Sequence, residues 1–204
     1  MALERKIAKH LLDIEAVALR PNDYFTWTSG IKSPIYCDNR ITMSYPTIRR
    51  EIAAGMSEVI KAKFPEVEVV AGTATAGIPH AAWVSEVLDL PMIYVRDSAK
   101  KHGKTNQIEG RLLEGQKVVI IEDLISTGLS SLKVAKALEE AGAVVLGVVA
   151  IFSYELKKAQ DAFAADKVEY YTLTNYNYLI EEAVVSGYIK QEDVEKLLEW
   201  RNNL

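Results

Sequence analysis

The chain has 204 residues, of which 49% are hydrophobic and 25% charged, and its formal net charge is −4 at pH 7. This length and hydrophobic content suffice for one folded domain with a substantial core. The negative net charge does not favour binding to nucleic acid or to an anionic membrane, because both kinds of partner are attracted to a basic protein surface.

The first twenty residues carry charged side chains throughout, so they fit neither a secretory signal peptide nor a membrane span. They predict instead an amphipathic helix, whose apolar face consists of Ile7, Leu11, Ile14 and Ala18. The single cysteine, Cys37, rules out an intrachain disulfide and is typical of a reducing compartment. We therefore expect a cytoplasmic protein.

An aromatic, turn-rich segment follows from Phe25 to Arg40, with the sequence FTWTSGIKSPIYCDNR. Its two Ser-containing dipeptides, Ser29-Gly30 and Ser33-Pro34, are turn signals. Aromatic side chains of such a segment can sandwich a flat ring, while Ser29 and backbone groups meet the polar edge of that ring. Taken alone, the segment fits a plain aromatic turn equally well.

Helices and short apolar strands then alternate along the chain. The predicted strands are 67–71, 92–95, 117–121, 144–151 and 168–173, and the predicted helices are 45–63, 79–88, 130–141, 155–165, 174–185 and 191–201. This alternation predicts an α/β fold with an open, mostly parallel sheet flanked by helices, and with ligands beyond the carboxyl ends of the strands. We expect a single domain, composed of a helix and hood (1–40), an α/β core (41–175) and a C-terminal helical segment (176–204).

The segment from Val69 to Pro79 runs from strand through a loop of small residues to helix. Gly72 and Gly77, with small residues between them, allow backbone N–H groups to face an anion such as a diphosphate. An ordinary turn explains any single residue of this loop equally well.

A basic segment, Arg96 to Lys104, follows the predicted strand 92–95 and carries three lysines, one arginine and one histidine against one acid. It lacks apolar periodicity, so we expect an exposed loop that rejoins the sheet only near Lys117. Positioned cations stabilise the negative charge of a departing phosphate group more in the transition state than in the ground state. A solvated surface loop is the alternative explanation.

The most informative segment is Val118–Ser131, with the sequence VVIIEDLISTGLSS. A buried strand is followed by two carboxylates, Glu122 and Asp123, then by a loop rich in hydroxyl groups, and then by a helix with Gly142 at its C-terminal cap. The N-terminus of a helix beside hydroxyl donors suits a phosphate. The two carboxylates suit the hydroxyl groups of a sugar that carries this phosphate. An ordinary capped helix would need neither feature.

Segment 118–131 resembles the phosphoribosyl-diphosphate (PRPP) signature of the type I phosphoribosyltransferases. The resemblance implies that Glu122 and Asp123 hold the ribose 2- and 3-hydroxyls and that residues 126–130 hold the 5-phosphate. The PRPP-binding residues that it implies are Arg96, Lys100, His102, Glu122, Asp123, Leu124, Ile125, Ser126, Thr127, Gly128, Leu129 and Ser130. Leu129 stands where orotate-using members commonly carry a second glycine, so it would be strained if its φ were positive.

Two further segments resemble the orotate-using members of this family, namely their catalytic loop (96–110) and their hood over the base (25–40). The catalytic residues that this resemblance implies are Arg96, Lys100, His102 and Asp123, and the implied orotate contacts are Ser29 and Ser126. It implies transfer of the ribose 5-phosphate group of PRPP to orotate, which gives orotidine 5-monophosphate and diphosphate in pyrimidine biosynthesis. It also implies a homodimer with shared active sites, and Mg²⁺ held mainly by the substrate rather than by a metal cage of the protein.

Two alternatives remain at this point. A transferase for adenine or uracil would share the PRPP signature but not the segment 96–110. A PRPP sensor without enzymatic activity would keep the phosphate loop and couple it to a partner surface. Such regulators usually carry an added basic or DNA-binding segment, and none is visible in this sequence.

Overall fold

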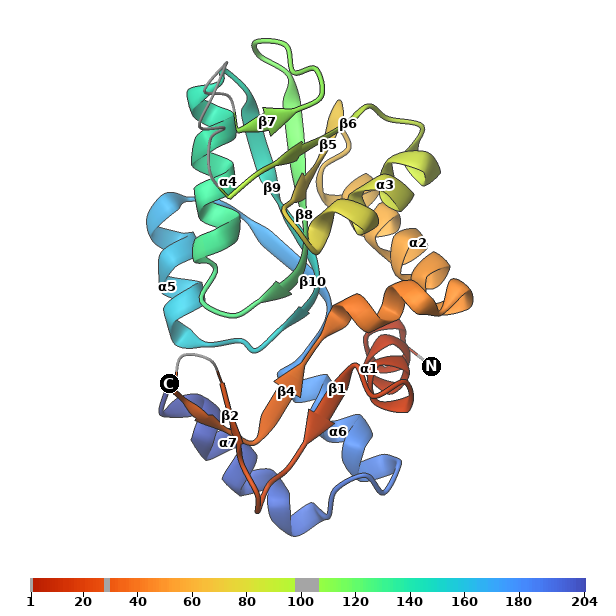
Figure 1. Cartoon of the computed structure of the whole chain (residues 1–204), viewed down its shortest axis with the longest axis vertical. Helices are drawn as coiled ribbons and strands as arrows, with labels where there is room; N and C mark the ends of the chain where they lie inside the picture. The colour runs from red at the N-terminus through yellow and green to blue at the C-terminus, as the bar shows by residue number, and fades with distance from the viewer. Residues whose placement is uncertain (1, 28–29, 98–106) are drawn as a thin grey trace.

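The computed structural model describes residues 2–27, 30–97 and 107–204, and these residues form one central six-stranded sheet with helices on both faces (Figure 1). In spatial order the strands are β10 (Tyr170–Asn175), β9 (Val144–Ser153), β8 (Lys117–Ile125), β5 (Val69–Thr73), β6 (Met92–Val95) and β7 (Ile108–Glu109). Neighbouring strands are parallel except for β7, which is antiparallel to β6. The predicted open, mostly parallel sheet is confirmed.

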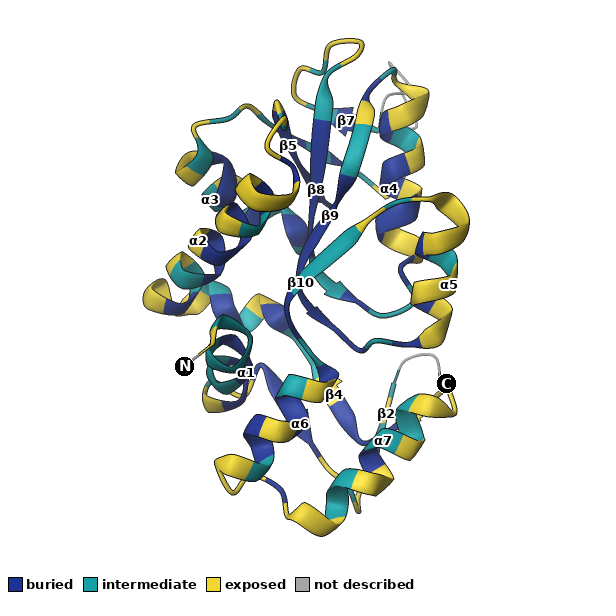
Figure 2. Cartoon of the chain, turned by 180° about the vertical axis from the view of Figure 1, so that it is seen from behind, coloured by how far each residue is buried: buried dark blue, intermediate teal, exposed yellow. Residues whose placement is uncertain are grey.

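Successive residues of the central strands pack into two different cores. Val119 and Ile121 of β8 pack on the side of α1 (Leu3–Asp13), α2 (Pro46–Lys63) and α3 (Gly77–Leu88). Val118 and Ile120 pack on the side of α4 (Leu129–Glu140) and α5 (Lys157–Asp166). This follows from the period of two along a strand, and each such buried side chain contributes roughly 1.5–3 kcal/mol. The sheet is therefore buried on both faces, as Figure 2 shows for β8 and β9.

The N-terminal helix is shorter than predicted. Ile7 and Leu11 are buried as expected, but α1 ends at Asp13 and Glu15 adopts a left-handed conformation with φ +57°. The next residues form strand β1 (Val17–Leu19), which is antiparallel to β4 (Ile35–Cys37). Ala18 lies in this strand, so its predicted place on the helix face is wrong. The reason is that pairing with β4 fixes the backbone of these apolar residues as a strand.

The other predicted elements are present with shifted ends. The largest shift is in β8, which we expected to end at Ile121 but which continues to Ile125. The strand continues because it still pairs with β9 there, through Glu122↔Ala150 and Leu124↔Phe152. The helix predicted from Gln191 begins as a short 3₁₀ turn, η2 (Gln191–Asp193), and continues as α7 (Val194–Asn202). Helix α6 (Tyr176–Val185) precedes it.

The basic segment rejoins the sheet earlier than expected. The backbone N–H of Arg96 donates to the carbonyl of Gln107 at 2.9 Å, and β7 then pairs with β6. The predicted return near Lys117 is therefore wrong, because Ile108 pairs with Val95 of β6, its apolar side chain is buried, and the chain thus gains an earlier point of attachment.

A small substructure lies at the end of the molecule opposite β7 (Figure 1). It comprises β1, β4, a short hairpin of β2 (Phe25–Thr26) and β3 (Lys32–Ser33), and the helices α6 and α7. We refer to the described residues 20–27 and 30–37 as the hood. No helix in the described part of the chain is long and apolar enough to cross a membrane.

Candidate active site

Two adjoining cavities lie where the sheet meets the hood. The polar cavity, of about 420 Å³, is lined by Cys37, Asp38, Arg40, Thr73, Ala74, Thr75, Ala76, Glu122, Asp123, Leu124 and Ser130. The aromatic cavity, of about 370 Å³, is lined by Thr26, Trp27, Tyr36, Cys37, Leu124, Ser126 and Tyr154. The two share Cys37 and Leu124, so a ligand with a charged part and a flat part can occupy both. Their place at the carboxyl ends of β5 and β8 agrees with the rule for parallel sheets.

The acid pair lies in the last part of β8 and lines the polar cavity. Glu122 is buried, and its carboxylate accepts hydrogen bonds from the Ser131 hydroxyl at 3.2 Å and from the backbone N–H of Asp123 at 3.0 Å. Burial raises the pKa of Glu122 to about 8, and the adjacent Asp123 carboxyl adds to this increase. Burial also raises the pKa of Asp123. Burial and the neighbouring carboxylate both favour the protonated form of Glu122, which can donate a hydrogen bond to the more exposed carboxylate of Asp123.

This raised pKa predicts a pH-dependent stability. Between about pH 4.5 and pH 8, Glu122 is ionised in the unfolded chain and protonated in the folded one, so the stability that it contributes is lost as pH rises through this window. The change Glu122→Gln mimics the protonated acid, so its melting temperature should exceed that of the wild type at pH 8 and approach it at pH 5. Thermal unfolding at both pH values tests this. Glu140→Gln, exposed on α4, is the control. An equal difference at the two pH values would contradict the assignment.

The loop after the acid pair joins β8 to α4. Gly128 has φ +78°, and a Cβ there would lie 2.7 Å from the Phe163 ring of α5, so both the backbone and the space require glycine. Leu129 is the first residue of α4 and its φ is not positive, so the strain considered for it does not arise. Within the described residues no side chain caps α4, which leaves its first N–H groups available to an anion.

The residues from Leu124 to Ser130 differ in which cavity they line. Ser126 lines the aromatic cavity and Ser130 the polar cavity. Thr127 lies between them in the same loop, outside both linings. The side chain of Ile125 is buried in the core beneath α4, so only its backbone can face a ligand. Leu124, in contrast, is shared by the two cavities.

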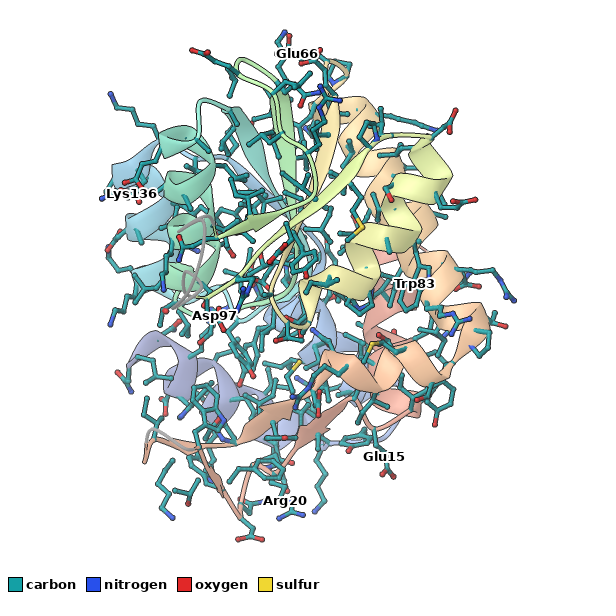
Figure 3. The ribbon with its side chains drawn as sticks, turned by 45° about the horizontal axis from the view of Figure 1, so that its top comes forward. Glu15, Arg20, Glu66, Trp83, Asp97 and Lys136 are labelled. Atoms are coloured by element: carbon teal, nitrogen blue, oxygen red, sulfur yellow. The ribbon has the colours of Figure 1, made fainter. Side chains whose placement is uncertain are left out.

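Of the three cationic side chains predicted to bind PRPP, only Arg96 belongs to the described residues. Arg96 directly follows β6, and its guanidinium lies 3.5 Å from the carboxylate of Glu109 rather than in either cavity lining. Next to it, the carbonyl of Asp97, labelled in Figure 3, accepts a hydrogen bond from Lys133 of α4 at 2.6 Å. Lys100, His102 and Ser29 lie outside the described residues.

A cation that the sequence interpretation did not assign lines the polar cavity. The Arg40 guanidinium donates to both carboxylate oxygens of Asp38, at 2.6 and 2.8 Å, and these bonds hold the pKa of Asp38 below its usual range. Between them in the sequence, buried Asn39 donates to the backbone carbonyl of Asp123 at 2.7 Å and so joins the segment that follows the hood to β8. The available signal was the polar run that follows Cys37.

The aromatic cavity is built from the hood and the end of β9. The rings of Trp27 and Tyr154 lie 5.5 Å apart, and the Trp27 indole N–H donates to the carbonyl of Ile35 at 3.1 Å. Tyr154 was not predicted, although it directly follows a strand of the parallel sheet. Burial raises the pKa of the Cys37 thiol well above its usual range, so Cys37 remains protonated and is not poised as a nucleophile. The cavity suits a flat ring with polar edges.

The loop after β5 completes the polar cavity. Its backbone N–H at Ala74 donates to the carbonyl of Val95 at 3.0 Å, and the Ala74–Thr75 peptide bond is cis. A Cβ at Gly77 would collide with the carbonyl oxygen of Ile121, so glycine lets α3 begin directly against β8. Among the described residues, no group of three or more acidic, histidine or cysteine side chains could hold a metal ion by itself.

Comparisons with known proteins agree on one family. Residues 44–186 match the family described as "Phosphoribosyl transferase domain". The orotate phosphoribosyltransferase of Enterococcus faecalis is 64% identical over 199 residues, which cover 98% of this chain and 95% of that protein. The one from Staphylococcus aureus is 62% identical over 202 residues, covering 99% and 100%. The crystal structure of orotate phosphoribosyltransferase from Aeropyrum pernix superposes with a TM-score of 0.77 at 28% identity, covering 90% of this chain and 99% of that one.

Proposed function

The chain belongs to the phosphoribosyltransferase family, within its orotate phosphoribosyltransferases, and we propose that it transfers the ribose 5-phosphate group of PRPP to orotate. The products are orotidine 5-monophosphate and diphosphate, in the biosynthesis of pyrimidines. The main support for this proposal is that the two cavities adjoin, with Cys37 and Leu124 lining both. The polar cavity presents carboxylates and hydroxyl groups, and the aromatic cavity presents aromatic rings.

The cavities suggest how the substrates are held. We assign the ribose hydroxyls to Asp123 and Glu122, and the 5-phosphate to the loop 126–130 with the free N–H groups of α4. We place the pyrimidine ring in the aromatic cavity, against the aromatic side chains that line it, where Ser126 can meet the polar edge of the ring. We assign binding of the diphosphate to the backbone groups of residues 73–76 and to the Arg40 guanidinium, which also line the polar cavity.

The reaction breaks the bond between ribose C1 and the diphosphate oxygen and forms a bond from C1 to a ring nitrogen of orotate. The electron pair of the broken bond leaves with the diphosphate. The nitrogen supplies the new pair and releases its proton to water or to the departing diphosphate. We expect a dissociative displacement with an oxocarbenium-like ribose. The protein contributes chiefly by aligning nitrogen and C1 and by stabilising the leaving group. We assign the second task to Arg96, Lys100 and His102, of which the last two lie outside the described residues.

The residues of the polar cavity fit an Mg²⁺ ion that binds mainly through the substrate. The polar cavity offers the carboxylates of Asp38 and Asp123, and oxygen atoms of this kind are the hard ligands that this ion prefers. Because the described side chains do not form a cage, the diphosphate, the ribose hydroxyls and water would supply the remaining ligands. When bound, the ion neutralises charge on the diphosphate.

We further propose a cytoplasmic homodimer in which each active site combines two subunits. One subunit would supply the acid pair and phosphate loop, and its partner would supply Lys100 and His102. The proposal rests on the ten residues that separate Arg96 from Gln107 in the sequence and on the isologous symmetry of most dimers. A segment that serves its own subunit is the alternative.

The loss of orotate absorbance in the presence of PRPP and Mg²⁺ tests the proposed function. Parallel reactions with adenine and uracil serve as controls. Consumption of orotate alone is the expected result. Consumption of another base in its place would assign the chain to that base, and binding of PRPP with no base consumed would make it a sensor.

A further inference from the structure

The C-terminal helix α7 packs against the hood rather than against the sheet. The Trp200 indole N–H donates to the carbonyl of Lys32 in β3 at 2.9 Å. The Trp200 ring stands edge-on to the Trp27 ring, with 5.9 Å between centroids and 86° between planes. Beneath it, fully buried Leu197 offers its carbonyl to the Tyr176 hydroxyl at 3.2 Å, which anchors α7 on the start of α6.

Trp27 is the residue through which α7 reaches the active site. On one side Trp27 contacts Trp200, and on the other it contacts Tyr154 and lines the aromatic cavity. Trp200 itself is absent from the lining of either cavity. Any effect of Trp200 on a bound ring is therefore indirect, through the position of Trp27.

The β2–β3 hairpin of the hood is short. The hairpin of β2 and β3 consists of the pairs Phe25↔Ser33 and Thr26↔Lys32, and an isolated two-stranded hairpin is marginally stable at best in water. Helix α7 touches this hairpin at Lys32 and the preceding segment at Asn22, where Lys196 donates to the Asn22 side chain at 3.0 Å. Lys196 also lies over the Tyr24 ring, at 5.6 Å from its centroid. Trp200 adds an indole–carbonyl hydrogen bond to β3 and a ring contact with Trp27.

We propose that Trp200 is a positioning residue for the pyrimidine base: by holding Trp27 and the β2–β3 hairpin, it sets the affinity for orotate without touching the ring. This inference rests on the proposed function. Because Trp27 lies on the aromatic side of the junction, the effect should be confined to the base and should spare PRPP, whose proposed contacts are on β8 and α4.

Steady-state kinetics of Trp200→Ala and Trp200→Phe test the proposal. Loss of one aromatic contact and one hydrogen bond predicts that Trp200→Ala raises KM for orotate by about tenfold, with kcat and KM for PRPP changed by less than about threefold. Trp200→Phe keeps a ring against Trp27 but loses the N–H donor, so its KM for orotate should lie between those of the wild type and the alanine variant. Glu195→Ala, exposed on the same helix, should match the wild type.

A second readout separates this inference from the proposed function. Hydrogen exchange of the amides in residues 24–37 should be faster in Trp200→Phe than in the wild type, while exchange in β8 and β9 should be unchanged. If the wild type consumes no orotate but the hood amides loosen, the proposed function fails and the coupling of α7 to the hood stands. Equal increases in both KM values, or unchanged exchange in the hood, would overturn the inference.

Discussion

Asp123→Ala is expected to lower kcat/KM for PRPP by about 10- to 150-fold while leaving the fold intact. Asp123 lines the polar cavity beside the proposed ribose site, so its truncation removes a partner of the substrate hydroxyls and of the adjacent Glu122 but deletes no apolar core group. Loss of a hydrogen bond to a charged group typically costs about 1.5–3 kcal/mol, and the expected factor follows from that range. Steady-state kinetics with varied PRPP at saturating orotate measures it.

Two controls make the result specific. Asp123→Asn keeps the size of the side chain and one acceptor, so its activity should lie between that of the wild type and that of Asp123→Ala. Asp161→Ala, on the outer face of α5 in an exposed pair with Lys157, should behave as the wild type. Thermal unfolding checks that each variant is folded. Turnover and PRPP affinity both within twofold of the wild type for folded Asp123→Ala would remove the ribose-holding role.

Activity is expected to reappear when two impaired variants, Lys100→Ala and Asp123→Ala, are mixed. If each site combines two subunits, a mixed dimer has one site with both lesions and one site with neither. Random exchange makes half of the dimers mixed, and half of their sites are intact, so activity should rise to roughly a quarter of the wild type. The measurement is the rate of orotate loss after subunits have been exchanged by mild denaturation and refolding.

The mixing experiment needs its own controls. Each variant carried alone through the same exchange should stay at its low activity. Differently tagged subunits allow mixed dimers to be purified and verified. Verified mixed dimers that remain inactive would show that each subunit completes its own site, and a chain that stays monomeric at assay concentration would rule out the shared site directly.

The part of the site that sequence could predict is local in the chain. The acid pair and the loop to Ser130 lie on one strand–loop–helix unit, so their order alone brings Asp123 and Ser130 to the same cavity. The resemblance placed Gly128 among the PRPP-binding residues, but the packing against Phe163 that requires glycine there appears only in the structure. The positive φ falls on Gly128 and spares Leu129, because α4 begins at Leu129.

The parts that sequence could not predict depend on long-range pairing. Tyr154 reaches the aromatic cavity because β9 lies beside β8, and Arg40 reaches the polar cavity because Asn39 bonds to the backbone of Asp123. Pairing also set the end of β8, which no local signal after Ile121 indicates. The same applies to Ala18, whose spacing fits a helix until β4 is placed beside it.

A crystal structure of the protein with orotidine 5-monophosphate tests the central claim most directly, because this single molecule should occupy both cavities. We expect the ribose hydroxyls within hydrogen-bonding distance of Asp123 or Glu122, the 5-phosphate against the backbone N–H groups of residues 126–130, and the pyrimidine ring in the aromatic cavity, against Trp27 or Tyr154. A nucleotide bound with its ring outside the aromatic cavity, or with its phosphate away from the N-terminus of α4, would contradict the account.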